Sequence, residues 1–369
     1  MNGLSVHKLR CEYKENPLGI DVREPRLSWQ LQSNCKGAMQ VAYRIQVAED
    51  NAFTVLVWDT GKMETDQCVH IIYGGEPLRS QTRYYYRVRV WDNRGRETDW
   101  SASAWWETAM LDKSVWKALW ITYDGEQTEG CPFLRTTFIC RGRVAEARIY
   151  ATSLGLYELR LNGSKVGEAL LTPGWTSYNK RLQYQTYDVT GNIYEERNAL
   201  GAILGNGWYK GKFGWNHEGD VYGGHLAALV QLHVRYEDGS EDVFFSDRSW
   251  KVSSGPILMS DIYHGETYDA RREKQGWDTA EYDDDLWVPA SVLDHTKDIL
   301  VAQESLPVKV TEEIKPIRLF TTLPERRCWI WDRTWWDGSA SAWKRRREAA
   351  LSCSMPRFWT TKATCILKT

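Results

Sequence analysis

The alternation of apolar and polar side chains along short segments is the feature that most constrains this fold. It is clearest in residues 84–91 (YYYRVRVW), and it recurs in residues 26–31 and 43–48. A period of two places successive side chains on opposite faces of a strand, and no helical period separates these segments. The chain is therefore predicted to be all-β and built from half-buried antiparallel strands.

Length and composition narrow the class of protein. The chain has 369 residues, more than the roughly 250–300 that one hydrophobic core usually serves, so two or three domains are expected. With 42% hydrophobic residues, 26% charged residues and a net charge of −2, it lacks the basic excess of a nucleic-acid binder. No segment reaches the roughly 20 apolar residues of a membrane span, and residues 1–8 contain no signal core. We expect a cytoplasmic protein without a nucleic-acid or membrane partner.

The cysteines and aromatic residues add little by themselves. The eight cysteines include no CxxC pair, so we expect reduced, structural thiols and no zinc site. The chain has 20 Trp and 19 Tyr beside 8 Phe. Aromatic rings with a polar tip suit the core of a β-sandwich, and they also suit a surface on which a sugar ring stacks. Composition leaves both uses open.

The first predicted domain is residues 1–109, a fibronectin type III or Ig-like β-sandwich. Its short strands are separated by turn residues, such as those at positions 92–95, and have no helix between them. Residues 100–105 are predicted to form its closing edge strand. The segment shows no catalytic pattern, so a spacer or docking module is expected.

The second predicted domain is residues 116–300, which is again all-β but has longer strands and more glycine. Residues 147–152 and 156–161 alternate, and Asn162-Gly163 follows the second of them directly. Asn-Gly is a strong signal for a two-residue hairpin turn, so we expect a strand to return from this point.

Five sequence blocks of this second domain resemble the N-terminal β-sandwich region of bacterial α-L-rhamnosidases. The resemblance implies a jelly-roll, galactose-binding-like sandwich of the kind found in carbohydrate-binding modules. The blocks are residues 161–167 (LNGSKVG), 172–181 (TPGWTSYNKR), 184–190 (YQTYDVT), 205–211 (GNGWYKG) and 262–271 (IYHGETYDAR).

The resemblance also implies a function. Members of that family continue through another β-sandwich into an α-helical barrel, where two carboxylates remove terminal L-rhamnose by an inverting hydrolysis. This chain is expected to lack that barrel. It is therefore interpreted as an N-terminal fragment of an α-L-rhamnosidase, an enzyme whose substrates are rhamnose-containing glycosides. The fragment itself is expected to have no catalytic residues and at most weak sugar binding. The alternative is a non-catalytic β-sandwich protein that binds carbohydrate or acts as a scaffold.

Two glycine-opened loops of the second domain carry the aromatic and amide residues that suit a sugar. Indole faces stack on the C–H groups of a pyranose, and amides bond its hydroxyls. Trp175 and Trp208 have a second interpretation, as buried residues that anchor the loops. The candidate sugar-binding residues are Trp175, Tyr178, Asn179, Asn206 and Trp208.

No cofactor is expected to be required, but Ca²⁺ is considered for the second domain. Asn179 and Asp220 are the candidate ligands, although their spacing matches no calcium-loop motif. Glu266 and Asp269 lie three residues apart, and an acid and base pair is one interpretation of this spacing. We expect them to be solvated loop carboxylates, since the family that the chain resembles places its catalytic pair elsewhere.

The C-terminal part changes character. Residues 301–324 are expected to form a linker and the first strand of a further sandwich. Residues 325–369 hold six of the 20 Trp and have no strand or helix period. When the codons are read one base earlier, residues 329–338 can become LDLGQNMVGW. Because Trp has a single codon, the shifted codons that begin in Trp329 and Trp331 each specify one residue. The resulting string is similar to the next sandwich of the rhamnosidase family. We therefore predict a frameshift between Thr322 and Cys328, and an out-of-frame tail at residues 325–369 that is disordered and has no evolved fold.

Overall fold

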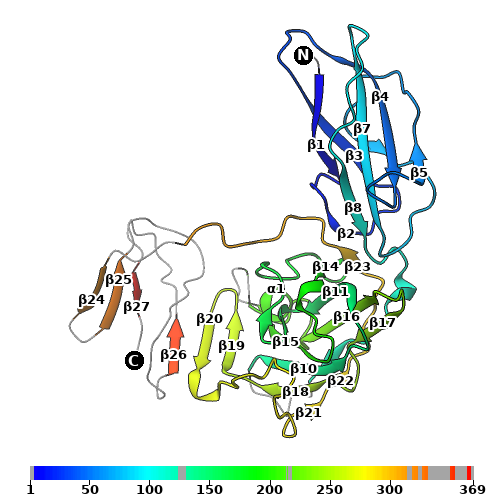
Figure 1. The fold of residues 1–369 in the computed structure, drawn as a ribbon. Helices are drawn as coiled ribbons and strands as arrows, with labels where there is room; N and C mark the ends of the chain where they lie inside the picture. Colours follow the sequence, from blue (N-terminus) through cyan, green and yellow to red (C-terminus); the bar gives the residue numbers. More distant parts are fainter. Residues whose placement is uncertain are drawn as a thin grey trace. The chain divides into compact units, whose positions relative to one another are not determined.

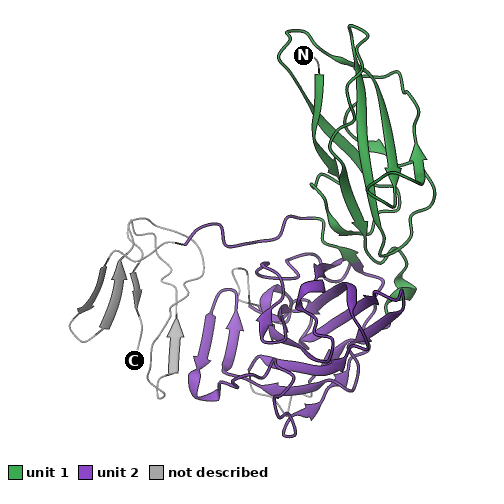
Figure 2. Ribbon diagram, viewed as in Figure 1, with its two compact units in different colours: residues 1–116, 301–304 green, residues 117–300, 305–369 purple. Residues whose placement is uncertain are grey.

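The computed structural model describes residues 4–123, 130–212, 214 and 218–313, together with the backbone of four short strands beyond them. The chain divides into two compact units (Figure 2). The first is Met1–Trp116 with Val301–Glu304, and the second is Lys117–Leu300 with Ser305–Thr369. Nearly all regular structure is β, and the single α-helix of the described residues is α1 (Gly207–Lys210). The all-β prediction is confirmed.

The first unit is a sandwich of two sheets (Figure 1). Its strands pair antiparallel except for β2 and β8, which run parallel. The three-stranded sheet has the order β1 (Leu4–Cys11), β3 (Arg26–Ser33) and β6 (Ile71–Ile72). The five-stranded sheet has the order β2 (Leu18–Ile20), β8 (Ala104–Thr108), β7 (Arg83–Asp92), β4 (Gln40–Ala48) and β5 (Leu56–Asp59). A 3₁₀ turn, η1 (Lys113–Val115), follows β8.

Strand β7 shows why the alternating segment at residues 84–91 forms this sandwich. Tyr84, Tyr86, Val88 and Val90 are buried, while the residues between them are half-buried on the other face. Trp106 of β8 lies fully buried among the aromatic rings of this inner face, with its ring 5.6 Å from that of Tyr84 and 5.3 Å from that of Tyr86. The period of two therefore reports one buried face.

The prediction of a closing edge strand at residues 100–105 is wrong in two respects. The strand is β8, which begins at Ala104, and it lies between β2 and β7 rather than at an edge. Upstream, Ser101 bonds Val88 of β7 through its backbone N–H, at 2.8 Å, but Trp100 turns its ring onto arginines of the sheet. β2, the parallel partner of β8, lies far earlier in the chain, so the alternation within residues 100–105 could not indicate this pairing.

The second unit is a larger sandwich. One sheet has the order β13 (Ser164–Lys165), β12 (Leu156–Leu161), β15 (Arg197–Gly205), β10 (Pro132–Ile139), β18 (Lys251–Ser254) and β21 (Val288–Pro289). The other has the order β22 (Ser291–Val292), β9 (Ile121–Thr122), β16 (Ala227–Tyr236), β11 (Val144–Leu154), β14 (Leu182–Asp188) and β23 (Leu300–Ala302), with β17 (Glu241–Phe245) also paired to β16. Two 3₁₀ turns, η2 (Thr190–Asn192) and η3 (Ala270–Arg272), complete the unit.

The core of the second unit lies between these two sheets. Leu159 and Leu200 contribute from the first sheet and Ile149 and Leu232 from the second, all at most 2% exposed. The long strands β11 and β16 pair over their full length, from Val144 opposite Tyr236 to Leu154 opposite Ala227. The register of this ladder shifts once, between Val144 and Glu146, and is otherwise regular.

The predicted hairpin at Asn162-Gly163 is confirmed. β12 and β13 pair antiparallel, with Leu161 opposite Ser164. Asn162 and Gly163 have φ values of 49° and 83°, which match the two left-handed central residues of a type I′ turn. The Asn162 side chain also accepts a hydrogen bond from the backbone N–H of Ala199 at 2.8 Å, so the turn is tied to the neighbouring strand.

A separate hairpin, β19 (Ile257–Asp261) and β20 (Gly265–Asp269), pairs through β20 with β26 (Ala350–Cys353) (Figure 1). The last three strands, β24 (Arg318–Thr322), β25 (Arg326–Ile330) and β27 (Thr364–Ile366), form a sheet of their own. Apart from strands β25, β26 and β27, the predicted out-of-frame tail at residues 325–369 lies outside the described residues.

Residues 301–304 belong to the first unit although they follow the second in sequence. The Asp21 carboxylate accepts a hydrogen bond from the backbone N–H of Ala302 at 2.6 Å, and the Lys14 ammonium donates to the carbonyl of Gln303. Burial, partly offset by the bond from Ala302, raises the pKa of Asp21. The first unit is therefore assembled from two distant pieces of the sequence.

Candidate functional site

The two loops singled out in the second domain meet through a pair of tryptophans. Trp175 lies in the segment between β13 and β14, and Trp208 lies in helix α1. Their rings are parallel within 5°, with centroids 6.1 Å apart. The Trp175 side chain is 55% exposed, so it is not a buried anchor, whereas Trp208 is half-buried. One indole thus supports another that faces solvent.

Tyr178 does not share that exposure. It is 1% exposed, and its hydroxyl donates to the Gly174 carbonyl at 3.0 Å. Its ring packs against those of Tyr209 and Tyr222, with centroids 5.4 and 5.0 Å away. Burial raises the pKa of Tyr178. Its place is beneath the loop as a support, and not on a face that a ligand touches.

The two amides lie in different settings. Asn206 directly precedes α1, and its carbonyl accepts from the N–H of Lys210 at 3.1 Å while its side chain makes no capping hydrogen bond. The Asn206 side chain is half-buried, and Gly207 separates Asn206 from Trp208 in the sequence. Asn179 is exposed in a turn whose Lys180 N–H donates to the Ser177 carbonyl at 2.8 Å.

The candidate calcium ligands do not form a recognisable cation site. Asp220 is exposed, has a φ of 55°, and its N–H donates to the Lys210 carbonyl at 2.9 Å. Within the described ranges, no group of three or more His, Cys, Asp and Glu side chains lies close enough to hold a metal ion. Oxygen ligands for Ca²⁺ would have to include backbone carbonyls, amides or a bound sugar.

Sequence reasoning missed the residues that hold this region together. Tyr222 accepts a hydrogen bond from the indole N–H of Trp175 at 3.4 Å. The Asp261 carboxylate, 6% exposed, accepts from the backbone N–H of Lys212 at 2.9 Å and of His264 at 3.0 Å. Burial acts to raise the pKa of Asp261, but these hydrogen bonds outweigh it and lower the pKa. The sequence did contain a signal for this residue, because Asp261 precedes a short turn that ends at Gly265, and Asp favours such positions.

Glu266 and Asp269 are not arranged as a catalytic pair. Both lie on β20, where a separation of three places them on opposite faces of the strand. The expectation of solvated loop carboxylates is wrong for Asp269, because it lies in a strand and is buried. It forms two 2.8 Å contacts with the Arg271 guanidinium, and the resulting hydrogen bonds lower its pKa to about 2. Hydrolysis requires two carboxyl groups that face one bond, which this geometry does not provide.

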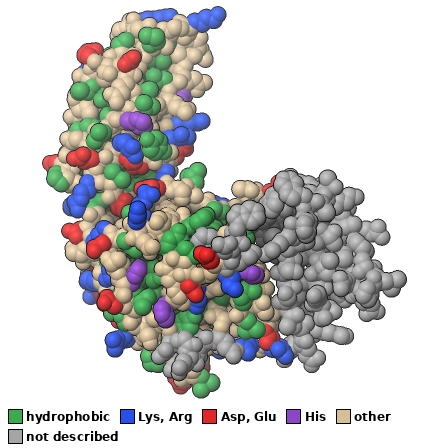
Figure 3. All heavy atoms as spheres, turned by 180° about the vertical axis from the view of Figure 1, so that it is seen from behind, with side chains coloured by type: hydrophobic (Ala, Val, Ile, Leu, Met, Phe, Trp, Pro, Cys, Tyr) green, Lys and Arg blue, Asp and Glu red, His purple; other side chains and the backbone are tan. Residues whose placement is uncertain are grey.

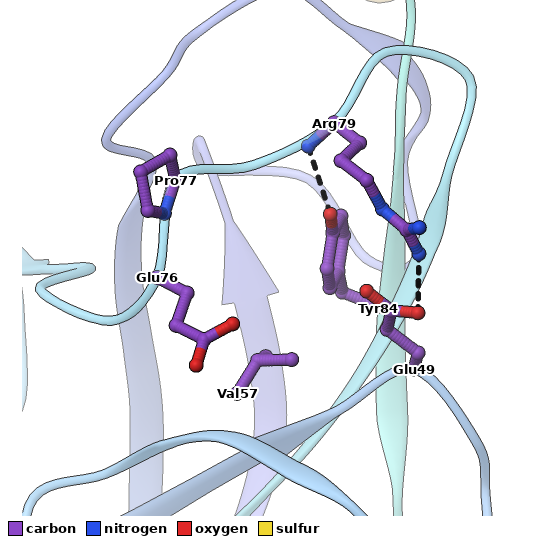
Figure 4. A pocket seen from close by; sticks show the side chains of 6 residues that line it. All are labelled: Glu49, Val57, Glu76, Pro77, Arg79 and Tyr84. Carbon is purple, nitrogen blue, oxygen red and sulfur yellow. Dashed lines mark hydrogen bonds and ion pairs between the residues drawn. The ribbon is translucent and has the colours of Figure 1, made fainter.

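The first unit contains a small hollow of about 190 Å³ (Figure 4). The guanidinium of Arg79 pairs with Glu49 at its edge, and the backbone N–H of Arg79 donates to the Tyr84 hydroxyl at 2.9 Å. Ligand clefts usually measure roughly 300–1,000 Å³, so this hollow is too small for a sugar site. Its lining residues are Glu49, Val57, Glu76, Pro77, Arg79 and Tyr84.

Charged side chains of both signs are present on the surface of the described residues. Figure 3 shows basic and acidic side chains interspersed over the face in view, in keeping with the net charge of −2. Among the described residues, no helix has the length and hydropathy needed to cross a membrane.

Comparison with known proteins gives a consistent picture for both units. Residues 6–112 match the family model of the Rha78A-like N-terminal immunoglobulin domain, and residues 142–312 match that of the alpha-L-rhamnosidase N-terminal domain. An α-L-rhamnosidase of Formosa agariphila is 33% identical over 348 residues, covering 86% of this chain and 37% of its own length. One of Streptomyces avermitilis is 30% identical over 496 residues, covering 87% and 48%. The chain thus spans between about a third and a half of these relatives.

Solved structures agree with the sequence relatives. The α-L-rhamnosidase from Dictyoglumus thermophilum superposes with a TM-score of 0.83 at 34% identity, over 90% of this chain and 39% of its own. The Streptomyces avermitilis α-L-rhamnosidase complexed with L-rhamnose gives a TM-score of 0.82 at 27% identity, over 89% and 49%. Both units, including the immunoglobulin-like first domain, therefore have counterparts in one class of protein.

Proposed function

Because this chain carries the immunoglobulin-like and the N-terminal domains of α-L-rhamnosidases, we propose that it is the N-terminal part of an enzyme that releases terminal L-rhamnose from glycosides. The chain itself is proposed to be catalytically inactive. The observation that carries this proposal is the match of both units to N-terminal domain models, in a chain that covers only 37% and 48% of its two α-L-rhamnosidase relatives. The opposed faces of Glu266 and Asp269 support it.

The second unit is further proposed to bind L-rhamnose weakly on the exposed face of Trp175. The Trp175 ring, at 55% exposed, is held by the parallel Trp208 ring, and a sugar can stack on its exposed surface. Asn206, two residues before Trp208 in sequence, is the candidate amide for the sugar hydroxyls. Few atoms of a monosaccharide engage an open surface, so the expected Kd is on the order of 0.1–1 mM.

Calorimetric titration of the full chain with L-rhamnose tests this face. Trp175→Ala is expected to weaken binding at least tenfold, and Asn206→Ala to weaken it less. Tyr194→Ala is the matched control, since Tyr194 is also an exposed aromatic residue of the second unit, at 59%. The sugar face is rejected if saturation is absent at tens of millimolar rhamnose, or if the folded Trp175→Ala variant binds like wild type.

Calcium is proposed as an optional ligand that bridges the sugar to Asn179 or Asp220. The exposed positions of both side chains support an open site whose coordination the sugar completes. The same titration with Ca²⁺ and with a chelator tests the idea. Equal rhamnose affinity in both conditions removes calcium from the site without affecting the stacking proposal.

The composition of residues 325–369 is proposed to result from a change of reading frame between Thr322 and Cys328. The family-model match ends at residue 312, ahead of that point, which supports the proposal. Sequencing the DNA around codons 320–330 decides it. A DNA sequence in which no base between codons 322 and 328 is gained or lost relative to the rhamnosidase-like frame would contradict it.

A cytoplasmic location is the last proposal. The five cysteines in the described part of the chain, Cys11, Cys35, Cys68, Cys131 and Cys140, are all free thiols. Thiols persist in a reducing compartment, whereas small secreted domains tend to form disulfides. Fractionation of the source cells with an antibody to this chain tests the location.

A further inference from the structure

Strand β7 places a row of arginines on the outer face of the first unit. Arg83, Arg87 and Arg89 alternate with the buried residues of the strand and are half-buried. The neighbouring strand β4 adds Arg44 directly opposite Arg89, and Gln46 opposite Arg87. Sheet geometry therefore concentrates guanidinium groups in one small area.

Three of these guanidinium groups surround one indole. The ring centroid of Trp100 lies 4.5 Å from Cζ of Arg89, 4.6 Å from that of Arg87 and 6.0 Å from that of Arg44. The Phe53 ring lies 4.2 Å from Cζ of Arg87. Cation–π attraction of this kind offsets part of the repulsion between the like charges.

The charges in this cluster are not fully balanced. Arg44 pairs with Asp59 at 2.6 Å, and Arg89 pairs with Glu97. Arg87 instead donates two hydrogen bonds, at 3.0 and 2.7 Å, to the neutral side-chain oxygen of Gln46.

Arg87 therefore contacts an amide where its neighbours contact carboxylates. The nearby Asp59 carboxylate accepts a hydrogen bond from the Gln46 amide at 2.9 Å, and its charge acts on Arg87 without a direct ion pair in the described residues. Burial, followed by the charges of Arg89 and Arg44, lowers the pKa of Arg87. An anion placed here would relieve the repulsion among three cations.

We propose that Arg87, flanked by Arg44, Arg89 and Trp100, binds an anionic substituent of a sugar, either a carboxylate or a sulfate. A guanidinium fork bonds both groups, and the remaining N–H groups of Arg87 have no acceptor among the described residues. The Trp100 and Phe53 rings provide apolar surface for the sugar ring that carries the anion. This site lies wholly within the first unit and does not depend on rhamnose binding by the second.

NMR titration of the full chain, observed at the arginine Nε–H groups, tests the proposal. The probes are glucuronate for the carboxylate, glucose 6-sulfate for the sulfate, and glucose as the neutral sugar. We expect at least one anionic sugar to shift the Arg87 signal with a Kd on the order of 1–10 mM, to bind several-fold more weakly at high salt, and glucose to produce no shift.

Two variants separate binding from structure. Arg87→Gln is expected to weaken the anionic sugar at least fivefold, measured by calorimetry. Arg79→Gln, a change at an exposed arginine of the same unit that pairs with Glu49, should bind like wild type. The proposal is overturned if neither anionic sugar shifts the wild-type Arg87 signal at tens of millimolar, or if both variants weaken binding equally. The wild-type measurement decides the matter even if Arg87→Gln fails to fold.

Discussion

The stability of the first unit depends strongly on the side chain of Trp106. The ring is fully buried and lies within 5.9 Å of the ring centroids of Tyr73, Tyr84 and Tyr86. Trp106→Ala is expected to destabilise this unit by about 3–5 kcal/mol, because a large cavity replaces the indole. Trp105→Ala is the matched control, since the adjacent half-buried Trp105 packs on Arg83 at the outer face and should cost far less. Denaturant unfolding measures both, and equal losses would contradict the packing.

His233 is expected to make the second unit sensitive to mild acid. Burial, and then the charge of Lys117, lower its pKa to about 4, whereas an unfolded histidine titrates near about 6.5. Between these values the unfolded state binds a proton that the folded state does not. Stability is therefore full above about pH 6.5 and declines as the pH falls towards 4, by at most about 1.4 kcal/mol per pH unit.

Melting curves between pH 7 and pH 4 test His233. His233→Gln keeps a hydrogen-bond acceptor for Gln231, whose amide lies 2.7 Å from the imidazole, and should flatten the pH dependence. His225→Gln, at an exposed histidine of the same unit, should leave it unchanged. An identical slope in wild type and His233→Gln would show that other groups control the acid response.

Single residues also show where sequence reasoning stops. Trp175 and Tyr178 lie three positions apart in one loop and have the same kind of amphipathic ring, yet one is 55% and the other 1% exposed. The difference arises because Tyr209 of α1 and Tyr222, from the segment after that helix, cover Tyr178. Residue type indicated that the loop was aromatic, but contacts from distant segments decide which ring a ligand can reach.

At the scale of elements, the hairpin between β12 and β13 depends on backbone conformation. Gly163 has a φ of 83°, and an added Cβ would meet its nearest atom at 3.5 Å, so space is not limiting. Gly163→Ala is expected to cost about 1–2 kcal/mol from backbone strain alone. Gly191→Ala is the matched control because nothing lies within 4 Å and its φ is not left-handed. Thermal unfolding should show a loss for the first variant and no loss for the second; similar values would contradict the strain argument.

Elements differ in how far they could be predicted. β7 and the Asn162-Gly163 turn follow from local signals, since a period of two and a left-handed residue pair each specify one structure. The place of β8 between β7 and β2 could not be predicted, because β2 pairs with it across more than eighty residues of sequence. The same limit applies to α1, whose four residues are too few to show a helical period.

At the scale of the whole molecule, the purified chain is expected to release no rhamnose from an aryl rhamnoside. Glu266 and Asp269 lie on opposite faces of β20 and so cannot act as an acid and base pair on one bond. The chain also covers at most 48% of the two relatives compared above. Restoring the predicted frame together with the downstream sequence should recover activity. Turnover by this chain that Glu266→Gln abolishes would refute the assignment.

The two-piece construction of the first unit has a consequence for its synthesis. A ribosome releases the chain from the N-terminus, so the partners of Asp21 and Lys14 at residues 302 and 303 emerge only after the entire second unit has been translated. Both sheets of the first sandwich are complete by Thr108, so it can close while its successor is made, and the contacts of Asp21 and Lys14 are added last. Arrested nascent chains stopped near residue 200 should already resist protease across strands β3, β4 and β7, whereas protection around Lys14 and Asp21 should increase only in chains that end well beyond residue 304.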